Sequence, residues 1–89
     1  MELKNIPVEI ISKCNIVGDI VPLRMRIENE EHQFIVATII DILYSTENNY
    51  AGVKSFDYGC KVTFNEKERL LELRYCILSH KWSIRKVIY

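Results

Sequence analysis

The sequence predicts an all-β fold, a small antiparallel meander of about six strands, and two observations carry this prediction. Apolar and polar residues alternate in several separate segments, most clearly from Leu71 to Ile77. A period of two gives each strand one apolar face for a core and one polar face for water. Short runs of Asn, Glu, Gly and Ser separate these segments and are typical of turns. A twisted sheet of this size should curl into a barrel of SH3-like size or a strongly bent sheet.

Size and composition favour a single β domain spanning residues 1–89. Twelve Lys and Arg residues balance twelve Asp and Glu residues, and a net charge of zero argues against a general nucleic-acid or membrane-surface binder. The N-terminus lacks the apolar core of a signal peptide. The longest apolar run, Phe34 to Ile40, is too short for a membrane helix. We therefore expect a cytoplasmic protein with no membrane partner.

The first two strands are predicted as a pair at the start of the chain. The first runs from Ile6 to Ile16, where Pro7 suits an edge position because proline cannot donate to a central ladder. A turn at Val17–Asp19 leads to the second strand, from Leu23 to Glu28. The polar stretch from Asn29 to His32 then closes a hairpin.

The third strand, from Gln33 to Tyr44, is almost continuously apolar and rich in β-branched residues, which favours a strand over a helix. A hairpin centred between Glu30 and Glu31 pairs Ile27 with Phe34 and turns Phe34 inward. The opposite face then carries four further apolar residues: Ile35, Ala37, Ile39 and Leu43. An antiparallel strand with two apolar faces needs a cover on both sides, either the bending chain itself or a second molecule.

The second half of the chain is predicted to contain one long loop and three strands. The loop spans Ser45 to Ser55, and the strands run from Phe56 to Phe64, from Arg69 to Leu78 and from Trp82 to Tyr89. Residues Glu66 to Ser79 also contain good helix formers, so a helix there is an open alternative.

Hairpin pairing of these strands brings apolar faces together. The apolar positions match when Val62 is paired with Leu71 and Tyr75 with Ile84. Trp82 is then expected to anchor the core, because large aromatic side chains dominate small cores.

Several motifs occur in a fixed order along the chain: Pro22–Glu28, Ala51-Gly52, Leu71–Tyr75 and Lys81–Ile84. With these motifs the chain resembles a group of short, uncharacterised bacterial all-β proteins with the pattern PLRFR-I … V-x-I-D … AG … ELKY-x-I … KW-x-L. The resemblance covers most of the chain from Ile6 onward. It implies the all-β fold and brings no assigned activity.

Residues that could carry chemistry are few and scattered. Cys14, Cys60 and Cys76 form an odd set without a secretory signal, which predicts free thiols in a reducing compartment. Cys60 is expected to point inward and Cys76 outward. A thiol enzyme acting through Cys76 would need a cation to hold the thiolate, but His80 lies roughly 13 Å further along a strand. We therefore predict that the protein is not an enzyme.

Metal and cofactor sites are not expected either. Glu28, Glu30, Glu31 and His32 cluster at one hairpin tip, where charge keeps the tip soluble, but they do not supply converging ligands. No Gly-rich phosphate loop is present, and no small-molecule substrate is evident.

Two functional hypotheses from different classes follow. The first is a non-catalytic protein-interaction module that forms a homodimer or binds another protein. Its contact residues would be Ile35, Ala37, Ile39 and Leu43, or the long loop around Tyr50. The alternative is a small nucleic-acid-binding β-barrel that uses an outward basic face. That face would consist of Arg24, Arg26, Lys61, Arg74 and Arg85.

Overall fold

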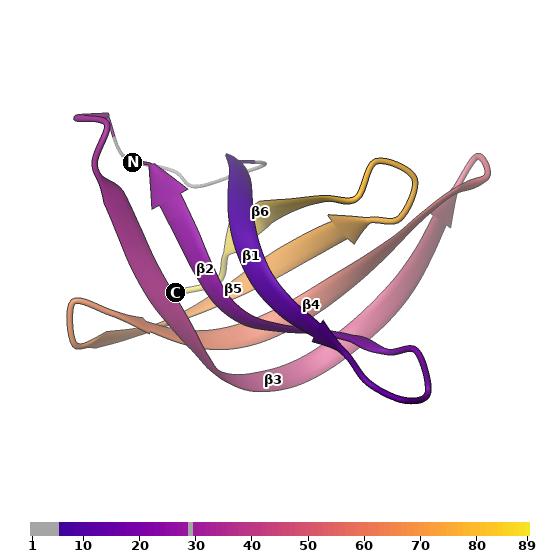
Figure 1. The fold of residues 1–89 in the computed structure, drawn as a ribbon, viewed down its shortest axis with the longest axis horizontal. Helices are drawn as coiled ribbons and strands as arrows, with labels where there is room; N and C mark the ends of the chain where they lie inside the picture. The colour runs from indigo at the N-terminus through magenta and orange to yellow at the C-terminus, as the bar shows by residue number, and fades with distance from the viewer. Residues whose placement is uncertain (1–5, 29) are drawn as a thin grey trace.

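The computed structural model describes residues 6–28 and 30–89 and contains six antiparallel strands, each paired with the next along the chain. The strands are β1 (Ile6–Cys14), β2 (Ile20–Glu28), β3 (Phe34–Tyr50), β4 (Val53–Phe64), β5 (Lys67–Cys76) and β6 (Lys81–Val87). Pairing of β1 with β6 closes the sheet into a barrel (Figure 1).

The predicted all-β meander is confirmed, and of the two predicted forms the closed barrel is the one observed. The segment for which a helix was an alternative forms β5. The predicted absence of a signal peptide concerns residues 1–5, which, like Asn29 of the predicted hairpin loop, lie outside the described residues.

The barrel interior is filled by alternate side chains of the strands, with β4 and β5 contributing the most. The buried apolar residues are Met25, Ala37, Tyr58, Cys60, Val62, Leu71, Leu73, Tyr75, Trp82 and Ile84. Three of the aromatic rings pack together, with centroids 5.5 Å apart for Tyr58 and Trp82 and 4.8 Å apart for Tyr75 and Trp82. This arrangement confirms Trp82 as a core anchor and the predicted inward faces of the last three strands.

The β2–β3 hairpin differs from the prediction by one residue of register. Ile27 pairs with Ile35 and Met25 with Ala37, whereas the expected partner of Ile27 was Phe34. Because side chains alternate with a period of two, a shift of one residue turns the whole strand over. Of the predicted outward residues of β3, Ile35, Ala37 and Ile39 therefore point into the barrel, and Phe34 points out. The prediction was wrong because it assumed an even number of loop residues.

The last two hairpins differ from the prediction by two residues, which leaves the faces unchanged. Val62 pairs with Arg69 and Cys60 with Leu71, because Asn65 and Glu66 alone form the β4–β5 turn. Their φ angles of 51° and 61° are those of a type I′ turn. In the same way, Leu73 rather than Tyr75 is the partner of Ile84.

The predicted long loop from Ser45 to Ser55 does not exist as a loop. β3 continues to Tyr50, the chain reverses at Ala51-Gly52, and β4 begins at Val53. The polar stretch has weak strand propensity, but it pairs residue by residue with β4, so tertiary pairing overrides the local preference. The other predicted strand ends lie within three residues of the observed ones.

Two register shifts in β3 bend this long strand around the barrel. They lie between Ile39 and Asp41 and between Ile42 and Tyr44. A bulge adds one unpaired residue, bends the strand and increases its twist. β3 accordingly sweeps in an arc beneath the barrel in Figure 1 before running alongside β4 to the hairpin tip. Within the described part of the chain, no helix has the length and apolarity needed to cross a membrane.

The β4–β5 turn supplies a test of this fold. Glu66 adopts a left-handed backbone conformation that costs an ordinary residue about 1 kcal/mol and glycine almost nothing. Glu66→Gly should therefore raise the free energy of unfolding by about 0.5–1 kcal/mol in urea denaturation. Glu68→Gly, one step into the β5 ladder, is the control and should lower it. A destabilising Glu66→Gly would contradict the two-residue turn.

Candidate functional site

The outer surface of β3 carries exposed apolar side chains both where the strand pairs with β2 and where it pairs with β4. We call Phe34, Val36, Ile40 and Leu43 the β3 outer stripe, and each is 49–57% exposed. Phe34 and Val36 alternate with inward residues, whereas Ile40 and Leu43 are the extra residues of the two bulges. The bulges therefore add two apolar groups to the outer surface without removing Ile39 and Ile42 from the core.

The predicted contact residues are divided between the interior and the surface. Ile35 and Ile39 are partly buried, and Ala37 is 1% exposed within the core, so these three do not lie on the expected outer face. The one-residue register shift is the reason. Leu43 does lie outside, as predicted, and Tyr50 is exposed at the end of β3 rather than in a long loop. The sequence prediction missed Phe34, Val36 and Ile40, and only the parity of the hairpin loop could have identified them.

Polar residues border the β3 outer stripe at its Phe34 end. The Arg26 guanidinium lies over the Phe34 ring at 4.2 Å from the centroid, which is a cation–π contact. Arg26 also donates a 2.7 Å hydrogen bond to Glu9 on β1. Ile11 extends the apolar surface onto β1, where it is 58% exposed. Contiguous exposed apolar groups with a polar rim are typical of protein-interaction surfaces.

The predicted basic face is largely neutralised by neighbouring carboxylates. Four of its five cations lie within 4.0 Å of one: Arg26 with Glu9 at 2.7 Å, Lys61 with Glu68 at 3.8 Å, Arg74 with Asp57 at 2.7 Å, and Arg85 with Glu72 at 2.9 Å. Arg24 has no acidic partner within residues 6–28 and 30–89. Phosphate contact would have to displace these pairs, so the arrangement does not favour nucleic-acid binding.

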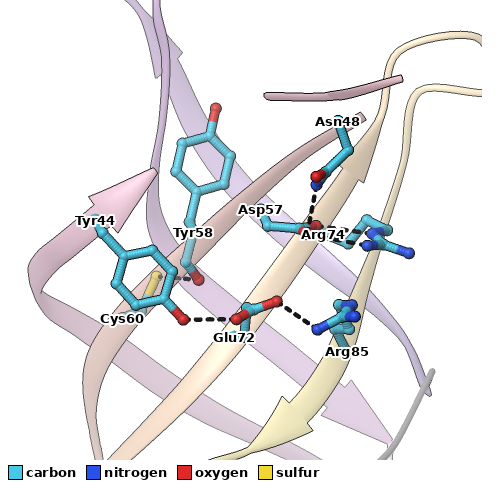
Figure 2. Close-up of polar contacts among 8 residues, drawn as sticks. All are labelled: Tyr44, Asn48, Asp57, Tyr58, Cys60, Glu72, Arg74 and Arg85. Carbon is cyan, nitrogen blue, oxygen red and sulfur yellow. Dashed lines mark hydrogen bonds and ion pairs between the residues drawn. The ribbon is translucent and has the colours of Figure 1, made fainter. Parts of the chain in front are cut away.

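A polar network covers the outer face of β4 and β5, and Figure 2 shows its two branches. In the first branch, the Tyr44 ring on β3 passes over Gly59 on β4, and its hydroxyl donates a 2.6 Å hydrogen bond to Glu72 on β5. Arg85 on β6 donates a 2.9 Å hydrogen bond to the other oxygen of Glu72. Burial and these two partners leave Glu72 5% exposed. The hydrogen bond to Glu72, together with burial and the carboxylate charge, raises the pKa of Tyr44 to about 12.

The second branch is centred on Asp57 of β4, which is also buried. Arg74 donates two hydrogen bonds to its carboxylate, of 2.7 and 2.9 Å, and Asn48 donates a third of 2.6 Å. Burial alone would raise the pKa of Asp57, but the hydrogen bonds and charge of Arg74, with the Asn48 bond, outweigh it and lower that pKa. Bidentate pairs of this kind are the stronger charge-assisted hydrogen bonds.

The network explains why β4 is buried on both faces. Its inner side chains fill the core, and its outer positions Asp57 and Gly59 are covered by side chains of β3 and β5. Sequence reasoning missed this network. Gly59 was the available signal, because a glycine inside a strand often marks a close approach by another group. The network holds strands together, and each of its buried carboxylates already has partners.

The cysteines lie in three different environments. Cys60 is fully buried in the core as predicted, and burial raises its pKa to about 12. Cys76 faces outward, and hydrogen bonds from Ser79 lower its pKa. Cys14 is exposed at the end of β1, and all three thiols are free. No base lies within hydrogen-bonding reach of Cys76 among the contacts of the described residues, since His80 instead bonds the Tyr75 hydroxyl at 2.8 Å.

The barrel interior opens at one end into an apolar cavity of about 450 Å³. Its wall includes Ile27, Ile35 and Phe64, and Glu28 and Glu30 are the carboxylates at its lining. The cavity could hold an apolar ligand, but its wall has few polar groups that would orient such a ligand. Among the described residues, no group of three or more His, Cys, Asp or Glu side chains could hold a metal ion.

The contact of Tyr44 with Gly59 yields a stability prediction. A Cβ at residue 59 would overlap the Tyr44 ring, so Gly59→Ala should lower the free energy of unfolding by about 1–3 kcal/mol. In a Tyr44→Ala background the overlap is absent, and the same substitution should cost much less. Urea denaturation of the four proteins of this cycle measures the coupling. Additive effects would contradict the packing of the ring over Gly59.

The Asp57 pair yields a prediction on pH. Because the folded-state pKa of Asp57 is lowered, its contribution to stability is present above the unfolded value of about 3.9 and is lost as the pH falls through the folded value. Asp57→Asn should cost about 2 kcal/mol at pH 7, with the difference from wild type shrinking below pH 4. The control Asp41→Asn, at an exposed carboxylate of β3, should change stability by less than about 0.5 kcal/mol. A pH-independent difference for Asp57→Asn would refute the lowered pKa.

Comparison with known proteins places the chain in no family. No family model, curated protein or solved structure matches it. The resemblance to short bacterial all-β proteins therefore stays a prediction.

Proposed function

We propose that this barrel is a non-catalytic protein-interaction module that associates with a second copy through the β3 outer stripe. The observation that carries the proposal is the exposure of four large apolar side chains on the outer surface of one strand. These side chains point away from the sheet, so a second sheet packed face to face on them would cover them. A two-fold axis through the stripe would make the contact self-complementary.

The expected strength of this contact follows from the exposed area. Each side chain of the β3 outer stripe is about half exposed, so covering it contributes about 1 kcal/mol. Four such residues on each of two copies contribute roughly 8 kcal/mol, which is comparable with the cost of association, estimated at about 4–15 kcal/mol. The proposal is therefore of a weak, reversible dimer that forms at micromolar concentrations or above.

The polar rim supports a specific contact rather than nonspecific adhesion. Arg26 holds the Phe34 ring from one side and is itself held by Glu9, so the aromatic group is ordered before association. Exposed Arg26 and Glu9 also give the rim both signs of charge, which lets a two-fold partner place an acid opposite each base.

The buried chemical groups support a structural rather than a catalytic role. Asp57 and Glu72 are each held by an arginine, and the Cys60 thiol is buried with a pKa of about 12. Groups already paired or shielded in this way serve strand-to-strand stability. We accordingly assign the interaction to the apolar surface and no reaction to the polar network.

Sedimentation equilibrium up to high micromolar concentration tests the proposal. Wild type should show a mass above the 10.5 kDa of one chain that rises with concentration, whereas Val36→Glu combined with Ile40→Glu should sediment as a monomer. Leu78→Glu is the matched control, since Leu78 is 78% exposed in the β5–β6 turn, and it should behave as wild type. Circular dichroism checks that each variant keeps its β structure. A wild type that stays monomeric throughout would overturn the proposal.

A further inference from the structure

The seam that closes the barrel is much shorter than the strands it joins. β1 pairs with β6 at three positions only, Ile6 with Ile84, Pro7 with Ser83 and Val8 with Trp82. β1 continues to Cys14, but the chain before β6 turns away into the β5–β6 connection. Residues 9–14 therefore have β2 on one side and, within the described part of the chain, no strand on the other.

This open edge faces a cleft of about 420 Å³. Ile10, Ser12 and Lys13 are among the residues that line it from β1, and Tyr75, His80 and Trp82 line it from the β5–β6 hairpin. The Tyr75 hydroxyl and the His80 Nδ1 are 2.8 Å apart, and the Tyr75 and Trp82 rings pack at 4.8 Å. The aromatic side chains of the cleft are thus held in place by their contacts with one another.

We infer that residues 9–14 of β1 bind an extended peptide segment of another protein, which adds as a further strand and inserts a side chain into this cleft. Alternate residues of a strand direct their N–H and C=O groups to the same side, so an open edge presents a row of unpaired donors and acceptors. An extended segment satisfies that row, and its alternate side chains reach whatever lies beside the edge. Here the neighbouring surface is aromatic, which favours an apolar or aromatic side chain.

The positive charge around the cleft favours an acidic peptide segment. Lys13 lies in its lining, and Lys81 follows His80 at the start of β6. Among the described residues, no carboxylate lines the cleft. A segment with Asp or Glu beside its apolar residue therefore complements the site. A second copy of this chain fits less well, because its own edge would bring another Lys13. The inference is independent of the dimer proposed above, which uses the outer face of β3.

A phage-displayed library of random octapeptides, selected on the full chain, supplies the probe. A selected peptide is synthesised with a fluorescein label and titrated by fluorescence anisotropy. We expect acidic sequences with one apolar or aromatic residue, and backbone amide shifts concentrated in residues 9–14 and at His80. Absence of any binding sequence, or shifts concentrated on the β3 outer stripe, would overturn the inference.

Backbone methylation of the peptide distinguishes strand addition from a contact made only by side chains. N-methylation of one alternate set of peptide residues should weaken binding at least tenfold, and methylation of the other set should have little effect. Equal effects of the two sets would refute strand addition. This comparison needs no variant of the protein and does not depend on how a variant folds.

Protein variants test the charge and separate this site from the dimer surface. Lys13→Glu should weaken binding of the acidic peptide by about tenfold, and Lys67→Glu, at an exposed lysine on the β4–β5 hairpin, should leave it unchanged. Val36→Glu combined with Ile40→Glu should also bind the peptide with wild-type affinity. Unaltered binding by Lys13→Glu would refute the charge selection, whatever the oligomeric state.

Discussion

The pairing of Glu28 with Phe34 across the β2–β3 hairpin determines which face of β3 lies in the core. With this register, Ile35, Ala37 and Ile39 face the interior, and the rest of the barrel packs on them. The opposite face of the strand carries large apolar side chains and is exposed. A shift by one residue would exchange the two sets, and the small Ala37 would leave the core in exchange for bulkier neighbours. The size of the core and the character of the outer surface thus depend on the same register.

The bulges and the polar network solve the problems that this long strand creates. A strand of 17 residues must bend strongly to remain part of a small closed barrel, and each bulge of β3 provides a bend at the cost of an unpaired residue. Beyond the bulges, Tyr44 and Asn48 lie over the outer face of β4 and bind Glu72 and Asp57. These contacts join β3 to β5 across β4, so the middle of the barrel is held by polar as well as apolar interactions.

The barrel leaves two kinds of surface incompletely satisfied. The β3 outer stripe lacks cover for its side chains, although the strand pairs with β2 from Phe34 to Thr38 and with β4 from Thr38 onward. Residues 9–14 of β1 differ, because the side of their backbone that faces the seam has no paired strand among the described residues. Apolar side chains favour face-to-face packing and unpaired backbone favours strand addition, so the two surfaces suit different partners. The two proposed contacts therefore use different residues.

The alternation of apolar and polar residues was enough to determine the class of fold, the number of strands, their order and most of their inward faces. The two-residue errors of register at the β4–β5 and β5–β6 hairpins left the predicted inward faces correct, because a shift of two residues keeps each side chain on the same face. The burial of Cys60 could also be foreseen, since it follows from local alternation.

Only the tertiary structure decided which face of β3 is exposed, that β3 extends to Tyr50, and that the barrel closes through a short seam. Each of these features depends on how many residues a turn or bulge contains, and a pattern with a period of two does not record that number. Composition also could not show that Tyr44 lies over Gly59, because that contact joins positions brought together only by the bulged β3–β4 register. The sequence alone determines that strands alternate, whereas the pairing between strands determines which surface is left for a partner.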